Sequence, residues 1–123
     1  MRYYVGLDVS LKTTQICVID EDQRIVWRGA SDTQPALIAE RLERLGLQLD
    51  LVGLETGSLT PWLYHSLKRA GLPVVCMDAR RAADAVRSRP EKTDKADARS
   101  LAEMLACGWY GEGYVKGLDR HRH

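Results

Sequence analysis

The order of strand and helix patterns along the chain is the feature that most restricts its fold. Five runs rich in β-branched, aromatic and other apolar residues read as strands, at residues 3–10, 13–20, 24–30, 50–55 and 73–78. Helix patterns lie at residues 31–46, 60–71, 79–88 (weak, and ended by Pro90) and from about Asp94 to Ala106. The three strands at the start are expected to be antiparallel, and helices then alternate with strands. The chain is therefore expected to be an α/β protein with helices packed on a mixed sheet.

Two of these helices carry start and stop signals. In the helix at residues 31–46 we expect a cap at Thr33 or Gln34, Pro35 in the first turn and an end at Gly46. In the helix at residues 60–71 we expect a cap at Thr60, Pro61 at the start and an end at Gly71. The residues expected to pack are Ile38, Leu42, Leu45, Trp62, Leu63 and Leu67. The whole order is that of the ribonuclease H-like fold, a mixed five-stranded sheet flanked by helices. In that fold the first and fourth strands are neighbours at the sheet centre.

The net charge of +1 hides an uneven distribution. Residues 1–78 hold eight basic against ten acidic side chains, whereas residues 79–100 hold seven against four. Such a block fits a polyanion such as nucleic acid, although it is equally consistent with a solvated helix face. Cys17, Cys76 and Cys107 have no metal-ligand spacing and are expected to be small core residues. No apolar run reaches the length of a membrane span and no leader pattern is present, so we expect a cytoplasmic protein without a membrane partner.

Two acidic residues follow apolar strand sequence. Asp8 interrupts the first strand within VGLDVS, and Glu55 closes the fourth within LVGLETGS. Burying a carboxylate is costly unless it is paired or bound to a metal. Asp8 is also consistent with a strand-end aspartate that caps a turn, and Glu55 with an exposed loop acid beside Gly57.

Two further acids open the last helix, in the stretch EKTDKADARSLAEML. Asp94 and Asp97 are typical of a capping box, and acids in a first turn complement the helix dipole. Steps of three and four from them reach the expected core stripe of Leu101, Met104 and Leu105. The two carboxylates should therefore lean toward the sheet as well.

In this fold the four acids Asp8, Glu55, Asp94 and Asp97 would converge. Four carboxylates at one place repel one another unless divalent cations lie between them, and all-oxygen ligands suit Mg²⁺ or Mn²⁺. Two such ions stabilise the attacking and leaving oxygens of an in-line phosphoryl transfer. The basic residues expected to hold neighbouring phosphates are Arg87, Arg89, Lys92 and Lys95.

The motifs GLDVS, GLETGS and KTDKADARSLAEM together resemble those of the DEDD-type insertion-sequence transposases, the IS110 and Piv DNA invertase family. The resemblance spans about residues 3–115, and its most specific part is the K-T-D-x-x-D-A core. The N-terminal domain of these proteins is similar to RuvC Holliday-junction resolvases. On this resemblance the acidic tetrad falls on Asp8, Glu55, Asp94 and Asp97.

The resemblance implies a Mg²⁺-dependent domain that cuts and rejoins DNA in transposition or site-specific recombination. It further implies an RNA guide, a homo-oligomer in the full-length protein, and a bacterial or archaeal cytoplasmic location at the nucleoid. Family members also carry a C-terminal domain with a serine nucleophile. We expect a RuvC-like domain over residues 1–107 and a loosely ordered tail over 108–123, with that second domain absent. Complete strand exchange by this polypeptide alone is then not expected.

Two rival interpretations stay open. GLDVSLKTTQICVID also resembles the phosphate-binding first hairpin of actin-like sugar kinases and Hsp70-type ATPases, which need a second glycine-containing phosphate loop that is not found in this sequence. Alternatively, the chain is a catalytically silent module that binds nucleic acid or dimerises with an intact transposase. Binding of Mn²⁺ at the four acids distinguishes a nuclease-like domain from such a module.

Overall fold

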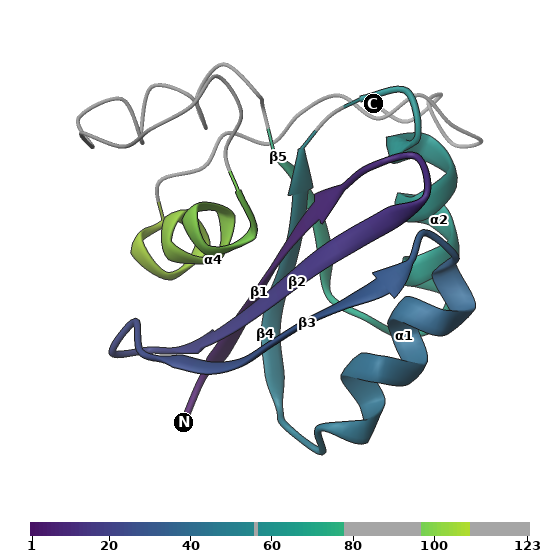
Figure 1. The fold of residues 1–123 in the computed structure, drawn as a ribbon. Helices are drawn as coiled ribbons and strands as arrows, with labels where there is room; N and C mark the ends of the chain where they lie inside the picture. The colour runs from purple at the N-terminus through teal and green to yellow at the C-terminus, as the bar shows by residue number, and fades with distance from the viewer. Residues whose placement is uncertain (56, 78–96, 109–123) are drawn as a thin grey trace, which may run out of the picture.

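The computed structural model describes residues 1–55, 57–77 and 97–108, and its centre is a five-stranded sheet in the order β3-β2-β1-β4-β5 (Figure 1). The strands are β1 Tyr3–Val9, β2 Thr13–Asp20, β3 Ile25–Asp32, β4 Leu49–Glu55 and β5 Val74–Met77. Antiparallel pairing joins β1, β2 and β3, whereas β4 is parallel to β1 and to β5. The mixed sheet and the adjacency of the first and fourth strands are thus confirmed.

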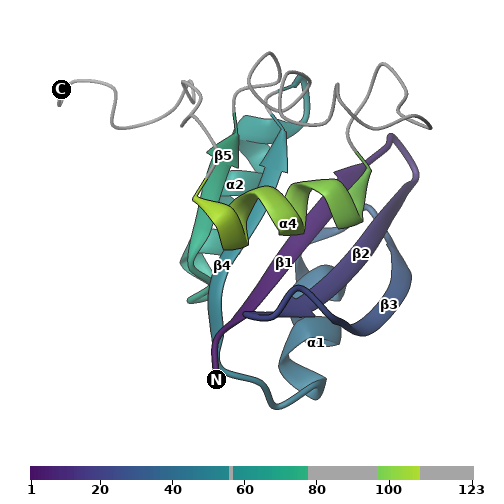
Figure 2. The ribbon, with the colours of Figure 1, turned by 90° about the vertical axis from the view of Figure 1, so that its left-hand side faces the viewer.

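Helices cover both faces of this sheet (Figures 1 and 2). The helices α1 (Pro35–Arg44) and α2 (Thr60–Arg69) pack on one face, and α4 (Ala98–Cys107) crosses β1 and β2 on the other and reaches β4. Side chains alternate accordingly along each strand, because successive residues of a strand point to opposite faces. Val5 and Leu7 of β1 enter the core under α1 and α2, while Tyr4 enters the core under α4.

The β2–β3 turn shows how local chemistry sets the register of the edge strand. Oδ1 of Asp20 accepts hydrogen bonds from the backbone N–H groups of Asp22 (2.9 Å) and Arg24 (3.0 Å). Gln23 adopts a positive φ of 65° within the same turn. Asp side chains stabilise turns in this way by bonding backbone groups a few residues on. The turn is followed by the pair Ile19–Ile25, and a register shift between Val18 and Ile19 then pairs Cys17 with Arg28, which places Arg28 on the α4 face of the sheet.

Two glycines, here called the glycine seat, allow α4 to approach the sheet closely. Gly6 of β1 and Gly53 of β4 are register partners at the sheet centre. A Cβ on Gly6 would lie 2.0 Å from the carbonyl oxygen of Ala98 and 2.7 Å from the backbone nitrogen of Ala102. A Cβ on Gly53 would meet side-chain atoms of Met77 (2.8 Å) and Leu105 (2.9 Å). The start of α4 therefore rests on the β1 backbone itself.

One of the two expected caps of the first helix is confirmed, and the expected cap of the second is not. The N-cap of α1 is Gln34, and its side chain makes no capping hydrogen bond. Thr33 instead donates from Oγ1 to the Ser10 carbonyl oxygen (2.7 Å) and accepts from the Thr14 hydroxyl (2.9 Å). The N-cap of α2 is Leu59, so the expected cap at Thr60 was wrong. Thr60 lies inside α2 because its hydroxyl donates to the Glu55 carbonyl oxygen (2.7 Å), which ties α2 to the end of β4.

Burial agrees with most of the expected packing residues. Ile38, Leu42, Leu63 and Leu67 are buried, and Leu45 packs against them. Trp62 was wrongly expected to pack: it is 46% exposed, because it stands one residue from the Leu63–Leu67 stripe and so points about 100° away from it.

Both helix ends at glycine are confirmed, since Gly46 (φ 64°) and Gly71 (φ 93°) adopt the left-handed conformation. Cys17 and Cys76 are buried, but Cys107 was wrongly assigned to the core: it is exposed at the last position of α4. The expected helix at 79–88 and the tail from residue 109 onward lie outside the described residues. No helix in the described part of the chain combines the length and apolar character needed to cross a bilayer.

Candidate active site

Asp8 and Glu55 stand at the same end of the two central strands. The register aligns Leu7 of β1 with Leu54 of β4, and each acid is the next residue along its strand. Strand alternation therefore puts both carboxylates on the face that carries the glycine seat and α4. Each residue is half-buried, and Oδ1 of Asp8 is fully buried.

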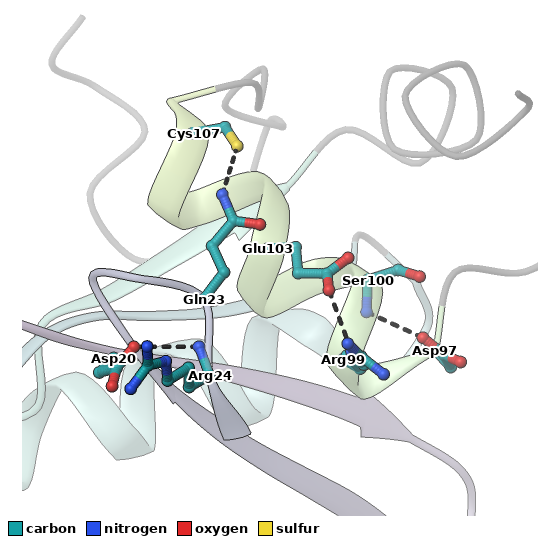
Figure 3. Close-up of polar contacts among 8 residues, drawn as sticks. All are labelled: Asp20, Gln23, Arg24, Asp97, Arg99, Ser100, Glu103 and Cys107. Atoms are coloured by element: carbon teal, nitrogen blue, oxygen red, sulfur yellow. Dashed lines mark hydrogen bonds and ion pairs between the residues drawn. The ribbon is translucent and has the colours of Figure 1, made fainter. Parts of the chain in front are cut away.

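Asp97 joins them from the start of α4. It is the N-cap residue, with extended backbone (φ −82°, ψ 176°), and one carboxylate oxygen accepts a hydrogen bond from the Ser100 N–H at 2.8 Å (Figure 3). The expected helix start near Asp94 was therefore wrong: α4 begins at Ala98, because Asp97 satisfies a free N–H of the first turn from a non-helical conformation. The expected core stripe was right, since Leu101, Met104 and Leu105 are all buried.

A cleft of about 420 Å³ brings Asp8 and Asp97 together between β1, β2, β3 and the start of α4. Its lining residues are Asp8, Gln15, Ile16, Arg28, Gly29, Ala30, Asp97, Ala98 and Arg99. Glu55 borders a second cleft of about 290 Å³ on β1, together with Ser10, Ser58 and Thr60. The structure thus places two of the expected acids in one cleft and a third at a separate cleft, which is also lined by Leu7 and Val9 of the α1 and α2 face.

The chemistry of these donors fits a hard divalent cation better than a soft one. Carboxylate oxygens are the ligands that Mg²⁺ and Mn²⁺ prefer. Among the described residues no group of three or more His, Cys, Asp or Glu side chains is arranged to hold a metal ion. The fourth expected acid, Asp94, lies outside those residues, as do Arg87, Arg89, Lys92 and Lys95. Burial raises the pKa of the nearby Cys17 thiol, which keeps it protonated and unsuited to metal binding.

Two arginines in the cleft were not anticipated from the sequence. Arg28 comes from β3 and Arg99 from the first turn of α4, and both are exposed. Arg99 donates from Nε to Oε2 of Glu103 at 3.0 Å, and the Glu103 side chain is only 12% exposed (Figure 3). The i to i+4 spacing of Arg99 and Glu103 is visible in the sequence. Arg28 could have been identified only from the β2–β3 register, which places it on this face of the sheet.

Comparisons with known proteins bear on the family and the fold of the chain. The model of a transposase family, the DEDD transposases of the IS110 type, matches residues 5–110. The chain belongs to this family. Its motifs had indicated the same membership, and that inference is confirmed. A comparison with curated proteins found no match.

Solved structures place this member of the DEDD transposase family in the ribonuclease H-like fold. Thermus thermophilus RuvC in complex with a Holliday junction substrate is 14% identical, with a TM-score of 0.61 over 92% of this chain and 100% of that one. A second Thermus thermophilus RuvC structure gives 0.58 at 14% identity, over 90% of this chain and 99% of that one. The ribonuclease H-like fold expected from the element order and the RuvC-like domain implied by the family resemblance are thus confirmed.

The ROK hexokinase of Thermus thermophilus is 24% identical, with a TM-score of 0.51 over 69% of this chain and 38% of that one. At these identities the likeness concerns the fold alone. The shared sheet explains why the first hairpin also resembles that of the actin-like kinases. Membership of the transposase family favours the nuclease-like interpretation over the kinase one.

Asp97 has a capping role that can be separated from its charge. Replacing Asp97 with Ala removes the hydrogen bond to the Ser100 N–H and should lower the free energy of unfolding by about 1 kcal/mol. Asn is an equally good N-cap, so Asp97→Asn should retain the stability of the wild type to within about 0.5 kcal/mol. Urea denaturation followed by circular dichroism measures both. Equal losses in the two variants would show that the cap contributes nothing.

Proposed function

We propose that this chain is the nuclease domain of a DEDD transposase, which cuts and transfers DNA strands in transposition with the help of carboxylate-bound Mg²⁺ or Mn²⁺. The observation that supports it best is the convergence of Asp8 and Asp97, from the first strand and the last described helix, on one cleft of a RuvC-like fold. Glu55 stands on the adjacent strand and Asp94 three residues before Asp97, so we assign all four as metal ligands and catalytic acids.

The residues of the chain have distinct parts in such a reaction. Asp8 projects from a rigid central strand, and Asp97 is oriented by its hydrogen bond to Ser100. Held this way, carboxylates need little reorganisation when a cation binds. A divalent ion bound there would polarise a phosphodiester and favour formation of the attacking hydroxide. The basic residues Arg87, Arg89, Lys92 and Lys95 are proposed to bind phosphates on the approach to the site.

The remaining assignments also rest on membership of the family. We propose DNA as the substrate, a guide RNA from the element and a second copy of the chain as partners, and the bacterial or archaeal nucleoid as the location. We assign residues 1–107 to the RuvC-like unit. Complete strand transfer is proposed to need the serine-bearing C-terminal domain of such transposases.

The deciding experiment is thermal unfolding with and without Mn²⁺. A ligand that binds only the folded state stabilises it by about 2.7 kcal/mol at one hundred times its dissociation constant. Mn²⁺ should therefore raise the Tm of the wild type by several degrees and have a much smaller effect on Asp8→Asn. Without metal, Asp8→Asn should be as stable as the wild type or more so, because carboxylate repulsion is relieved.

A matched control is Asp50→Asn, an exposed acid at the opposite end of β4, which should respond to Mn²⁺ as the wild type does. An equal Mn²⁺ effect in the wild type and in Asp8→Asn would contradict the proposal. It would favour the second candidate, a catalytically silent module that binds nucleic acid or dimerises. That candidate is supported by the use of Asp97 as an ordinary N-cap.

A further inference from the structure

We propose that Arg28 and Arg99 form a clamp for backbone phosphates of DNA across the cleft that holds Asp8 and Asp97. The inference rests on the proposed function, since it names the residues through which the same cleft would hold its substrate. Neither arginine belongs to the basic block around residues 87–95, from which phosphate binding was expected. They come instead from β3 and α4, and both line the cleft.

The position of Arg99 is fixed by its own helix. Its Nε donates to Oε2 of Glu103 one turn further on, and the low exposure of the Glu103 side chain strengthens this ion pair. A guanidinium carries five N–H donors, so the bond from Nε to Glu103 uses one and leaves the donors of the two terminal NH₂ groups for a ligand in the cleft that Arg99 lines. Figure 3 shows Arg99 at the start of α4 between Glu103 and Asp97. A guanidinium held in this way loses little conformational entropy when it binds a phosphate.

Arg28 reaches the cleft from the sheet. Its β-strand register with Cys17 places it on the α4 face, and it is exposed. Within the described part of the chain the ion pairs are Arg44–Glu40 and Arg99–Glu103, so no carboxylate there neutralises Arg28. Among the described residues, Arg28 therefore forms no ion pair with Asp8 or Asp97.

The mixture of charges in the cleft indicates the kind of ligand. Two arginines beside two carboxylates weaken the binding of a cation alone, because like charges repel. The same arginines favour a ligand that brings negative charge together with the cation, as a phosphodiester does. The cleft would then accommodate both charges at once: its carboxylates would hold the metal, and its guanidinium groups would hold the phosphate. Metal and DNA should consequently enhance each other's binding.

The test is the salt dependence of binding to a fluorescein-labelled DNA duplex, measured by fluorescence anisotropy in EDTA and in Mg²⁺. Each phosphate contact contributes about 0.9 to the slope of log K against log salt. The double variant R28Q/R99Q should therefore lose about 1.8 from the slope and bind about tenfold more weakly at low salt. The double variant R28K/R99K should restore the slope, since both charges return, but only part of the affinity.

The control is Arg41→Gln, an exposed arginine of α1 on the opposite face of the sheet, which should leave the slope unchanged. The inference is overturned if R28Q/R99Q keeps the wild-type slope, if Arg41→Gln reduces binding equally, or if the wild type does not bind the duplex. It is also overturned if only an RNA duplex of the same sequence shows the loss. Circular dichroism melting checks that R28Q/R99Q is folded.

The two proposals fail in different ways. The metal proposal depends on the difference in Mn²⁺ stabilisation between the wild type and Asp8→Asn. The clamp depends on the salt slope, which is read in EDTA as well. R28Q/R99Q should retain the Mn²⁺ stabilisation, because removing two nearby cations does not weaken the binding of a third.

Discussion

Replacing Gly6 with Ala is expected to lower the free energy of unfolding by about 3 kcal/mol or more, at or above the upper end of ordinary overpacking. The added Cβ would lie 2.0 Å from the Ala98 carbonyl oxygen and 2.7 Å from the Ala102 nitrogen. Both are backbone atoms, so no side chain can rotate away and α4 itself must move. A loss of this size corresponds to a fall in Tm on the order of 10–15 °C.

The same variant tests the link between the glycine seat and the cleft. Displacing α4 carries Asp97 away from Asp8, which stands two residues beyond Gly6 on β1. Gly6→Ala should thus also lose the Mn²⁺ stabilisation. Gly57→Ala is the matched control, since among the described residues other than its chain neighbours its Cβ would have only the Thr60 hydroxyl within 4 Å, at 3.8 Å. If Gly6→Ala proved as stable as Gly57→Ala, α4 would not be seated as described.

Leu101→Ala is expected to cost about 2–5 kcal/mol, the range for a leucine removed from a packed core. Leu101 is completely buried in the cluster that α4 forms with Tyr4, Ile19 and Met77. Truncating it leaves a cavity between the helix and the sheet, which weakens the attachment of the only described helix on that face.

The comparison for this second variant is Leu37→Ala on α1. Leu37 is 41% exposed, so the same truncation should cost about 1 kcal/mol or less. Urea denaturation of both variants gives the two free energies. Similar losses at the two leucines would mean that α4 contributes no more to the core than a surface position does.

The architecture was accessible from the sequence because its signals are local and repeat along the chain. Period-two strands, a proline at the start of α1 and of α2, and a glycine beyond the end of each described helix appear in the order that the structure adopts. That order was enough to place Asp8 and Glu55 on adjacent strands. Errors arose where a polar side chain had more than one available partner. Thr60 reads as a cap, for example, but its hydroxyl bonds to the Glu55 carbonyl oxygen.

The features that position the cleft could not be read in this way, because they are set by contacts between distant segments. Nothing near Gly6 in the sequence indicates that the backbone of Ala98 will lie against it. Arg28 has no local signature either, and its place on the α4 face depends on the register of the β2–β3 pair. The direction of Asp97 was inferred from a helix that was taken to begin about four residues earlier than it does.

The hydrogen bond between Asp97 and Ser100 makes the first turn of α4 and the cleft a single thermodynamic unit. Whenever that turn frays, the carboxylate loses the bond that orients it and the cleft loses one of its walls. The apparent affinity for anything bound there is then the intrinsic affinity scaled by the fraction of molecules in which the turn is formed. A substitution elsewhere on α4 that alters only this fraction would thus change the apparent affinity without contacting the bound molecule.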